Sequence, residues 1–212
     1  AGIGEQILNL RVMSRLVRIH RAIHHYGLTE FLRGTSLERR LKWIAVVSPW
    51  LWFNGRAHGS RGERLRVALQ ELGPVFVKFG QAISTRRDLL PVDLADELAK
   101  LQDQVPPFPS DQAVAVLAHA FGKPVGEVFT DFTAEPEASA SVAQVHFATL
   151  PDGREVAVKI LRPGIERVIA HDVALLDAAA GLIEAVWPDG RRLKPREVVA
   201  EFAKHLEDEL DL

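Results

Sequence analysis

The chain has 212 residues and a formal net charge of −2 at pH 7, with apolar and charged fractions that are ordinary for a folded protein. It is long enough to bury a core as one or two domains, so disorder is not expected. The absence of cysteine excludes disulfides, thiolate metal sites and cysteine nucleophiles, and it fits a reducing compartment such as a bacterial cytosol.

Charge is unevenly distributed along the chain. Residues 1–66 contain 12 Lys and Arg against 4 Asp and Glu, a surplus of +8. We expect this basic front to face something anionic, either a membrane surface or the acidic remainder of the same protein. No nucleic-acid partner is predicted, because the basic residues follow a helical pattern without an RNA-binding signature.

Two helices are predicted in the first 60 residues. In residues 7–32 apolar side chains recur at helical spacing with arginines between them, which indicates a basic amphipathic helix. Residues 37–53 are rich in tryptophan, which suits a membrane interface or an apolar groove but is equally typical of ordinary helix packing. The tryptophans concerned are Trp43, Trp50 and Trp52.

Neither a membrane span nor a metal site is predicted in this front part. The apolar stretch of residues 43–53 is far shorter than the roughly 20 residues that cross a bilayer. A secretory signal peptide is not expected either, because no apolar run with a small-residue cleavage site follows a charged start. His20, His24 and His25 have no carboxylate partner in helical register, so they do not indicate a metal site.

The middle of the chain is predicted to be helical. A long apolar stripe indicates one helix over residues 62–87, which Pro74 should perturb near its middle. Short helices are predicted for residues 91–104 and 111–121. The prolines of residues 105–109 exclude regular helix between them.

A β-hairpin is predicted after this helical part. Residues 142–150 and 155–161 have strand character, and residues 151–153 form a turn sequence between them. A helix should follow from about residue 163 to residue 187, and a last one should run from about residue 195 to the end. The predicted class is therefore α+β and mostly helical, with a short antiparallel sheet.

The second strand of this hairpin contains the sequence Val156-Ala157-Val158-Lys159. Protein kinases carry such a lysine on a strand, where it pairs with the α- and β-phosphates of ATP. Taken alone the pattern is weak, because a lysine at the end of a valine-rich strand is usually only a solvated strand end.

Upstream of this strand, a loop rich in small residues occupies the position of a kinase glycine-rich loop. Small side chains allow the backbone to approach phosphates, but the Cβ of alanine disfavours the positive φ angles that glycine permits. We therefore expect a stiffer loop that binds nucleotide differently. Its candidate nucleotide-binding residues are Ala138, Ser139, Ala140, Ser141, Val142 and Ala143.

Together with these two motifs, several further segments resemble the UbiB family. The segment Lys78-Phe79-Gly80-Gln81 matches the KxGQ signature of that family, and Glu209-Leu210-Asp211 matches its ExD motif. Residues 72–77, 84–89, 101–103 and 188–193 extend the resemblance over most of the chain. The order of these motifs identifies the chain as a member of the UbiB family. The resemblance is to the N-terminal part of the family's proteins.

This resemblance implies a protein-kinase-like fold in which the KxGQ helices lie over a site for ATP or ADP. It implies roles at that site for Lys159, Lys78, Gln81, Glu209 and Asp211. Without the family, Lys78 and Gln81 would be interpreted as a surface lysine and a helix-end glutamine. The glutamate that pairs with the strand lysine, and the ligands of Mg²⁺, are expected after the last residue of the sequence.

The resemblance also implies the function of the whole protein. Family members are atypical kinase-like ATPases of ubiquinone (coenzyme Q) biosynthesis, which implies partners among membrane-bound quinone or isoprenoid lipid precursors and other ubiquinone-biosynthesis proteins. The expected location is the cytoplasmic face of the bacterial inner membrane. The catalytic loop is not in this sequence, so we do not expect the chain itself to hydrolyse ATP.

The sequence is also compatible with two other functions. The chain could be a non-catalytic, membrane-peripheral module that binds lipid or acts as a scaffold through its basic, tryptophan-bearing helices. A generic protein kinase ranks third, because the Ala-rich loop and the KxGQ motif both argue against peptide phosphorylation. The predicted parts are basic helices over residues 1–60, a KxGQ helical extension over residues 61–133, and a partial kinase-like N-lobe over residues 134–212.

Overall fold

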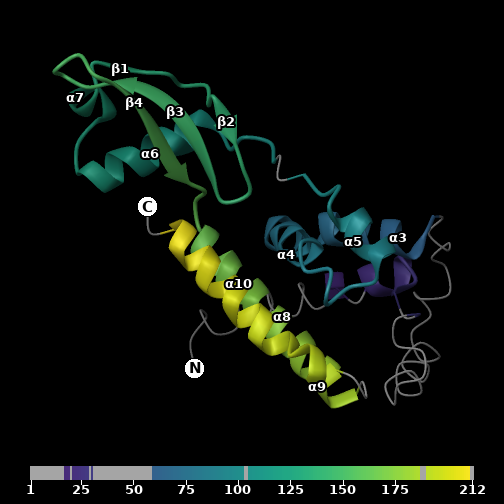
Figure 1. Ribbon diagram of the computed structural model, residues 1–212. Helices are drawn as coiled ribbons and strands as arrows, with labels where there is room; N and C mark the ends of the chain where they lie inside the picture. The colour runs from purple at the N-terminus through teal and green to yellow at the C-terminus, as the bar shows by residue number, and fades with distance from the viewer. Residues whose placement is uncertain are drawn as a thin grey trace. The chain divides into compact units, whose positions relative to one another are not determined.

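The computed structural model describes residues 17–19, 21–28, 30, 59–102, 105–186 and 190–210. These residues form helices and a four-stranded antiparallel sheet (Figure 1). They divide into two compact units, the first comprising Ala1–Leu101 and His171–His205 and the second Gln102–Ala170 and Leu206–Leu212. The division into three parts expected from the sequence stays a prediction.

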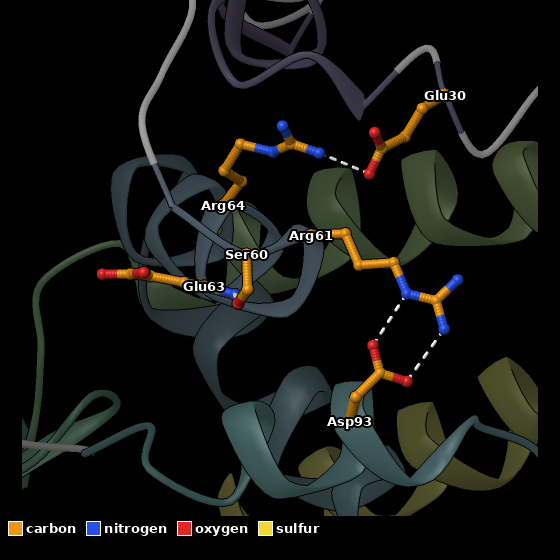
Figure 2. Close-up of polar contacts among 6 residues, drawn as sticks. All are labelled: Glu30, Ser60, Arg61, Glu63, Arg64 and Asp93. Atoms are coloured by element: carbon orange, nitrogen blue, oxygen red, sulfur yellow. Dashed lines mark hydrogen bonds and ion pairs between the residues drawn. The ribbon is translucent and has the colours of Figure 1, made fainter.

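The first unit is helical. It contains α3 (Arg61–Leu72), α4 (Pro74–Ser84), α5 (Val92–Leu98) and α9 (Gly190–Leu193), with most of α8 (Ile165–Val186) and α10 (Pro195–Leu210). Ser60 caps α3 by accepting a hydrogen bond from the Glu63 amide on its side-chain oxygen (Figure 2). Its core is apolar, and its buried residues include Ala68, Leu72, Val75, Ala95 and Leu98.

A break at Gly73 replaces the single long helix that was predicted over residues 62–87. Gly73 has a φ of 113°, which residues with a side chain rarely adopt, and α3 ends there. Pro74 then occupies the first turn of α4, where a missing N–H costs nothing. The position of the perturbation was predicted correctly, but the helix ends and restarts instead of bending.

The second unit is built around the sheet. It contains α6 (Ser110–Phe121), α7 (Val125–Val128), β1 (Asp131–Phe132), β2 (Ala138–Ser139), β3 (Ala143–Thr149) and β4 (Glu155–Leu161). β3 pairs antiparallel with each of the other three strands. The predicted hairpin is confirmed as β3 and β4. The strands β1 and β2 were not predicted, because two residues are too few to show an alternating pattern.

Alternation along β3 and β4 decides which face of the sheet is buried. Ile160 and Ala148 are buried in a cluster with Phe108, Leu117 and Phe129, which come from the segment before α6, from α6 itself and from the residue after α7. Side chains at the intervening positions point to the other face and, apart from Ala143, are half-buried or exposed. One face of the hairpin therefore builds the core, and the other is available for binding.

The predicted helices in the C-terminal half are confirmed within one or two residues for α6 and α8, and α10 begins at Pro195 as expected. Residues 17–19 and 21–25 are helical, as predicted for that stretch. The remainder of the predicted N-terminal helices, including Trp43, Trp50 and Trp52, lies outside the described residues. No helix in the described part of the chain is long and apolar enough to cross a bilayer.

Candidate functional site

The candidate site begins with Lys159 on the exposed face of the hairpin. Val145 lies opposite Lys159 and Phe147 lies opposite Ala157 in the β3–β4 register. Phe147 is 51% exposed, so an aromatic ring lies on this face. We call this surface the open face; it consists of Val145, Phe147, Thr149, Glu155, Ala157 and Lys159.

Part of the open face is hollowed. A cavity of about 310 Å³ is lined by residues of β3, of β4 and of β1 with its C-terminal side: Phe147, Ala148, Thr149, Glu155, Val156, Ala157, Asp131 and Thr133. This volume is at the lower end of the range for small-molecule sites. Ala157, which lines the cavity, is two residues before Lys159 in β4. An apolar side chain and a cation therefore lie along one strand.

Lys159 is held by the last turn of α10. Its Nζ donates a hydrogen bond of 2.9 Å to the main-chain oxygen of Glu209. The final carbonyls of a helix lack partners within the helix and carry a partial negative charge, so they attract a cation. The structure thus brings together Lys159 and Glu209, which the sequence placed in two separate motifs. Asp211 lies outside the described residues.

The Ala-rich loop is a tight hairpin turn between β2 and β3. Ala138 and Ser139 form β2 and pair with Val145 and Gln144 of β3. The Ala140 amide donates to the Ala143 oxygen at 2.9 Å and closes the turn.

Side chains in this turn differ in exposure. Ser141, Val142 and Ala143 are buried, whereas Ala138 and Ala140 are exposed. Among the described residues Lys194 is the one non-glycine residue with positive φ, so the turn closes with φ angles that alanine accepts. The conformational restriction expected from alanine is therefore compatible with a closed turn.

The KxGQ residues lie on α4 in the first unit. Gln81 Nε2 donates to the Leu101 oxygen at 3.0 Å. Gly80 is buried, and a Cβ at this position would lie 2.5 Å from Leu101 Cδ1 and 2.9 Å from Leu69 Cδ1. Lys78 is half-buried. The Gly-Gln half of the motif thus fixes Leu101, a role that was not predicted; the nucleotide-site roles of Lys78 and Gln81 stay predictions.

Another KxGQ residue packs against α10. The rings of Phe79 and Phe202 meet edge to face with centroids 5.2 Å apart. This contact belongs to the first unit, so the KxGQ segment helps to hold the N-terminal part of α10.

Three polar residues near the turn were missed by the sequence analysis. Gln144 and His146 are fully buried on the core side of β3. The main-chain oxygen of Thr133 can only accept, so His146 Nδ1 donates to it at 2.8 Å. His146 Nε2 then accepts from Gln144 Nε2 at 2.9 Å. Gln144 Oε1 accepts from the Phe108 amide at 3.1 Å. Polar residues at the inward positions of a predicted strand were the signal that could have found this network.

Arg162, the third missed residue, follows β4 directly. Its guanidinium donates to the Ala140 oxygen, the Ser139 hydroxyl and the Pro106 oxygen at 2.8 to 3.0 Å. Its position three residues after the kinase-like lysine was visible in the sequence, but its partners were not.

Arginine–carboxylate pairs dominate the polar contacts of the first unit. Arg61 binds Asp93 through two hydrogen bonds of 2.7 and 2.8 Å, and Arg64 pairs with Glu30 (Figure 2). The Arg61 hydrogen bonds hold the pKa of the Asp93 carboxyl below its ordinary value of 3.8. Within the described residues no group of three His, Asp or Glu side chains could hold a metal ion.

Comparisons with known proteins agree with these motifs. Residues 100–212 match the ABC1 atypical kinase-like domain. The chain is 54% identical over 200 residues to a Marinobacter nauticus protein named "Probable protein kinase UbiB", covering 94% of this chain and 36% of that protein. A Pseudomonas putida protein of the same name is 50% identical over 206 residues, which cover 97% of this chain and 38% of that protein. The chain thus spans somewhat over a third of the length of these curated relatives.

A solved structure with some likeness is the erythromycin complex of Rv3197 from Mycobacterium tuberculosis. It is 29% identical with a TM-score of 0.43, and the match covers 82% of this chain and 40% of that one.

The match to the ABC1 domain extends over more than half of the chain and includes the Ala-rich turn, Lys159 and Glu209. The chain therefore belongs to the UbiB family of ABC1 atypical kinase-like proteins.

Proposed function

We propose that this chain provides part of the nucleotide-binding N-lobe of an atypical kinase-like ATPase that supports ubiquinone biosynthesis. One observation carries the proposal: Lys159 lies on the open face near the end of β4, which pairs with the strand that follows the Ala-rich turn, as a phosphate-binding lysine does in kinases. Family membership supplies the role in ubiquinone biosynthesis. The alternative function is a membrane-peripheral lipid-binding or scaffold module.

The ligand proposed for the open face is ATP or ADP. Val145 and Ala157 would contact the apolar base, and the turn and Lys159 would bind the phosphates. Phosphate oxygens would compete with the Glu209 carbonyl for the Lys159 ammonium, because a charged acceptor binds a cation more strongly than a neutral one. The described residues offer no carboxylate cluster for Mg²⁺, so its ligands are proposed to lie elsewhere in the whole protein.

Substitution of Lys159 tests this proposal. In the full-length protein we expect Lys159→Ala to weaken binding of ADP and ATP at least tenfold, because a charge-assisted hydrogen bond contributes about 1.5–3 kcal/mol. Calorimetric titration measures the affinity. Lys123→Ala, an exposed lysine of the second unit, is the matched control and should bind normally. Normal affinity in Lys159→Ala would refute nucleotide binding at this strand.

The Ala-rich turn is proposed to set the preference between ATP and ADP. Ala140→Gly relaxes the backbone of an exposed turn residue and should change the ratio of the two affinities. Equal changes, or none, would exclude a selective role for the turn. The roles proposed for Lys78, Gln81 and Asp211 are tested by the same titrations on their alanine variants.

Membrane association is proposed from the basic front part and its tryptophans, at the cytoplasmic face of the inner membrane and near quinone or isoprenoid precursors. Liposome flotation tests it with vesicles that contain either neutral or anionic lipids. We expect recovery with anionic vesicles only. Equal recovery with both would remove the electrostatic part of the proposal, and no recovery would remove the membrane partner.

A further inference from the structure

A proline-rich segment, residues 105–109, is bound to the sheet by side chains. We call it the proline strap. Three of the residues 106–109 are prolines without an N–H, so this stretch cannot pair as a regular strand. Its one remaining amide, that of Phe108, donates to Gln144 Oε1, and the Phe108 oxygen accepts from Gln144 Nε2 at 3.5 Å. The strap is therefore attached to β3, directly beside the Ala-rich turn.

Arg162 joins the proline strap to the Ala-rich turn. Nη2 donates to the Pro106 oxygen at 2.9 Å and to the Ser139 hydroxyl at 2.8 Å, while Nε donates to the Ala140 oxygen at 3.0 Å. The guanidinium also lies 5.6 Å from the centre of the Phe108 ring. The Arg162 guanidinium thus donates to two acceptors of the turn and to one of the proline strap, and it also lies over the face of the Phe108 ring.

The main chain of Arg162 adds a further restraint on the turn. Its amide donates to the Val142 oxygen at 2.9 Å, so the carbonyls of Ala140 and Val142 are bound by the same residue. With the Ala140–Ala143 hydrogen bond, the turn has main-chain contacts along its length. A turn held in this way loses little further conformational freedom when a ligand binds.

We propose that Arg162 is a positioning residue for nucleotide binding, which fixes the Ala-rich turn against the proline strap before the nucleotide arrives. This inference rests on the proposed nucleotide site and assigns Arg162 no contact with the ligand. Removing the guanidinium should lower the fraction of molecules whose turn is ordered. The apparent dissociation constant rises in inverse proportion to that fraction.

Hydrogen exchange and nucleotide titration on the full-length protein test the inference together. For Arg162→Ala we expect a roughly tenfold weaker affinity for Mg-ADP and Mg-ATP, which requires the ordered fraction of the turn to fall to about a tenth, so amide exchange in residues 138–143 without nucleotide should approach the rate of an unprotected chain. Arg162→Lys keeps the charge but loses the planar guanidinium with its several N–H donors, so it should recover thermal stability more fully than nucleotide affinity. Arg154→Ala is the matched control, because Arg154 is exposed and pairs with Asp152 in the β3–β4 turn.

The outcomes separate this inference from the proposed function. Unchanged exchange and affinity in Arg162→Ala would overturn the positioning role, even if Lys159→Ala loses nucleotide binding. Faster exchange with unchanged affinity would also overturn it, since the residue would then act only on stability. If the unsubstituted protein binds neither nucleotide, both proposals fall. Should Arg162→Ala not fold, Arg162→Lys takes its place: faster exchange in residues 138–143 together with weaker nucleotide affinity supports the inference, and no change in either overturns it.

Discussion

The two units use different polar chemistry. In the first unit, arginine–carboxylate pairs join neighbouring segments at exposed positions, as in Arg61–Asp93 and Arg196–Asp177, whose side chains are 43 to 55% exposed. In the second unit, Gln144 and His146 form neutral hydrogen bonds at positions that are 0% exposed. Solvent reaches the first arrangement but not the second.

This difference predicts unequal consequences of substitution. An exposed pair exchanges its partner for water when one residue is lost, and salt screens it. A buried amide has no such replacement, so removing one member leaves other groups unsatisfied. The polar contacts beside the Ala-rich turn should therefore matter more to stability than the more numerous ion pairs of the helical unit.

The largest effect is expected for Gln144→Ala. It leaves the Phe108 amide and His146 Nε2 without partners in the core, and we expect the free energy of unfolding to fall by about 3 kcal/mol. Urea denaturation followed by circular dichroism measures this. Gln112→Ala, an exposed glutamine of α6, should change stability by less than about 0.5 kcal/mol. Similar losses in both variants would contradict the contrast between buried and exposed polar groups.

An intermediate effect is expected in the KxGQ helix. Gly80→Ala places a Cβ against the buried side chains of Leu101 and Leu69, and the overpacking should destabilise the protein by about 1–2 kcal/mol. Gly181→Ala is the control, because its Cβ would meet only Arg196 at 3.9 Å. There the higher helix propensity of alanine should stabilise by up to about 1 kcal/mol. A gain at both positions would show that Leu101 can move aside freely.

The smallest effect is expected for the exposed ion pairs, and it depends on pH. The pKa of Asp93 is lowered, chiefly by its hydrogen bonds from Arg61, so its stabilising contribution is complete above the ordinary value of 3.8. That contribution is lost as the pH falls through the lower folded-state pKa. Asp93→Asn should therefore reduce stability slightly at neutral pH and flatten its loss in acid, as measured by thermal unfolding from pH 7 to pH 2. An unchanged acid profile would show that the pair contributes nothing.

Local sequence signals located most of the elements. The alternating valines of β4 and the turn at residues 151–153 predicted the hairpin, because a strand buried on one face requires period-two alternation. Gly73 and Pro74 marked the boundary between α3 and α4, although the periodic stripe across them was interpreted as one helix. Pattern alone did not predict β1 or β2, whose pairing depends on β3 as a neighbour.

By itself, the sequence determined the family and the hairpin that carries Lys159, because these depend on motif order and strand period. Only the tertiary structure decided the partners: Lys159 meets Glu209 across 50 residues, Gln81 meets Leu101 across 20, and Arg162 meets Pro106 across 56. Such pairs are fixed by how distant segments pack, since a polar side chain binds whichever unsatisfied carbonyl the fold brings near it. Neither residue of such a pair carries a local pattern that identifies the other.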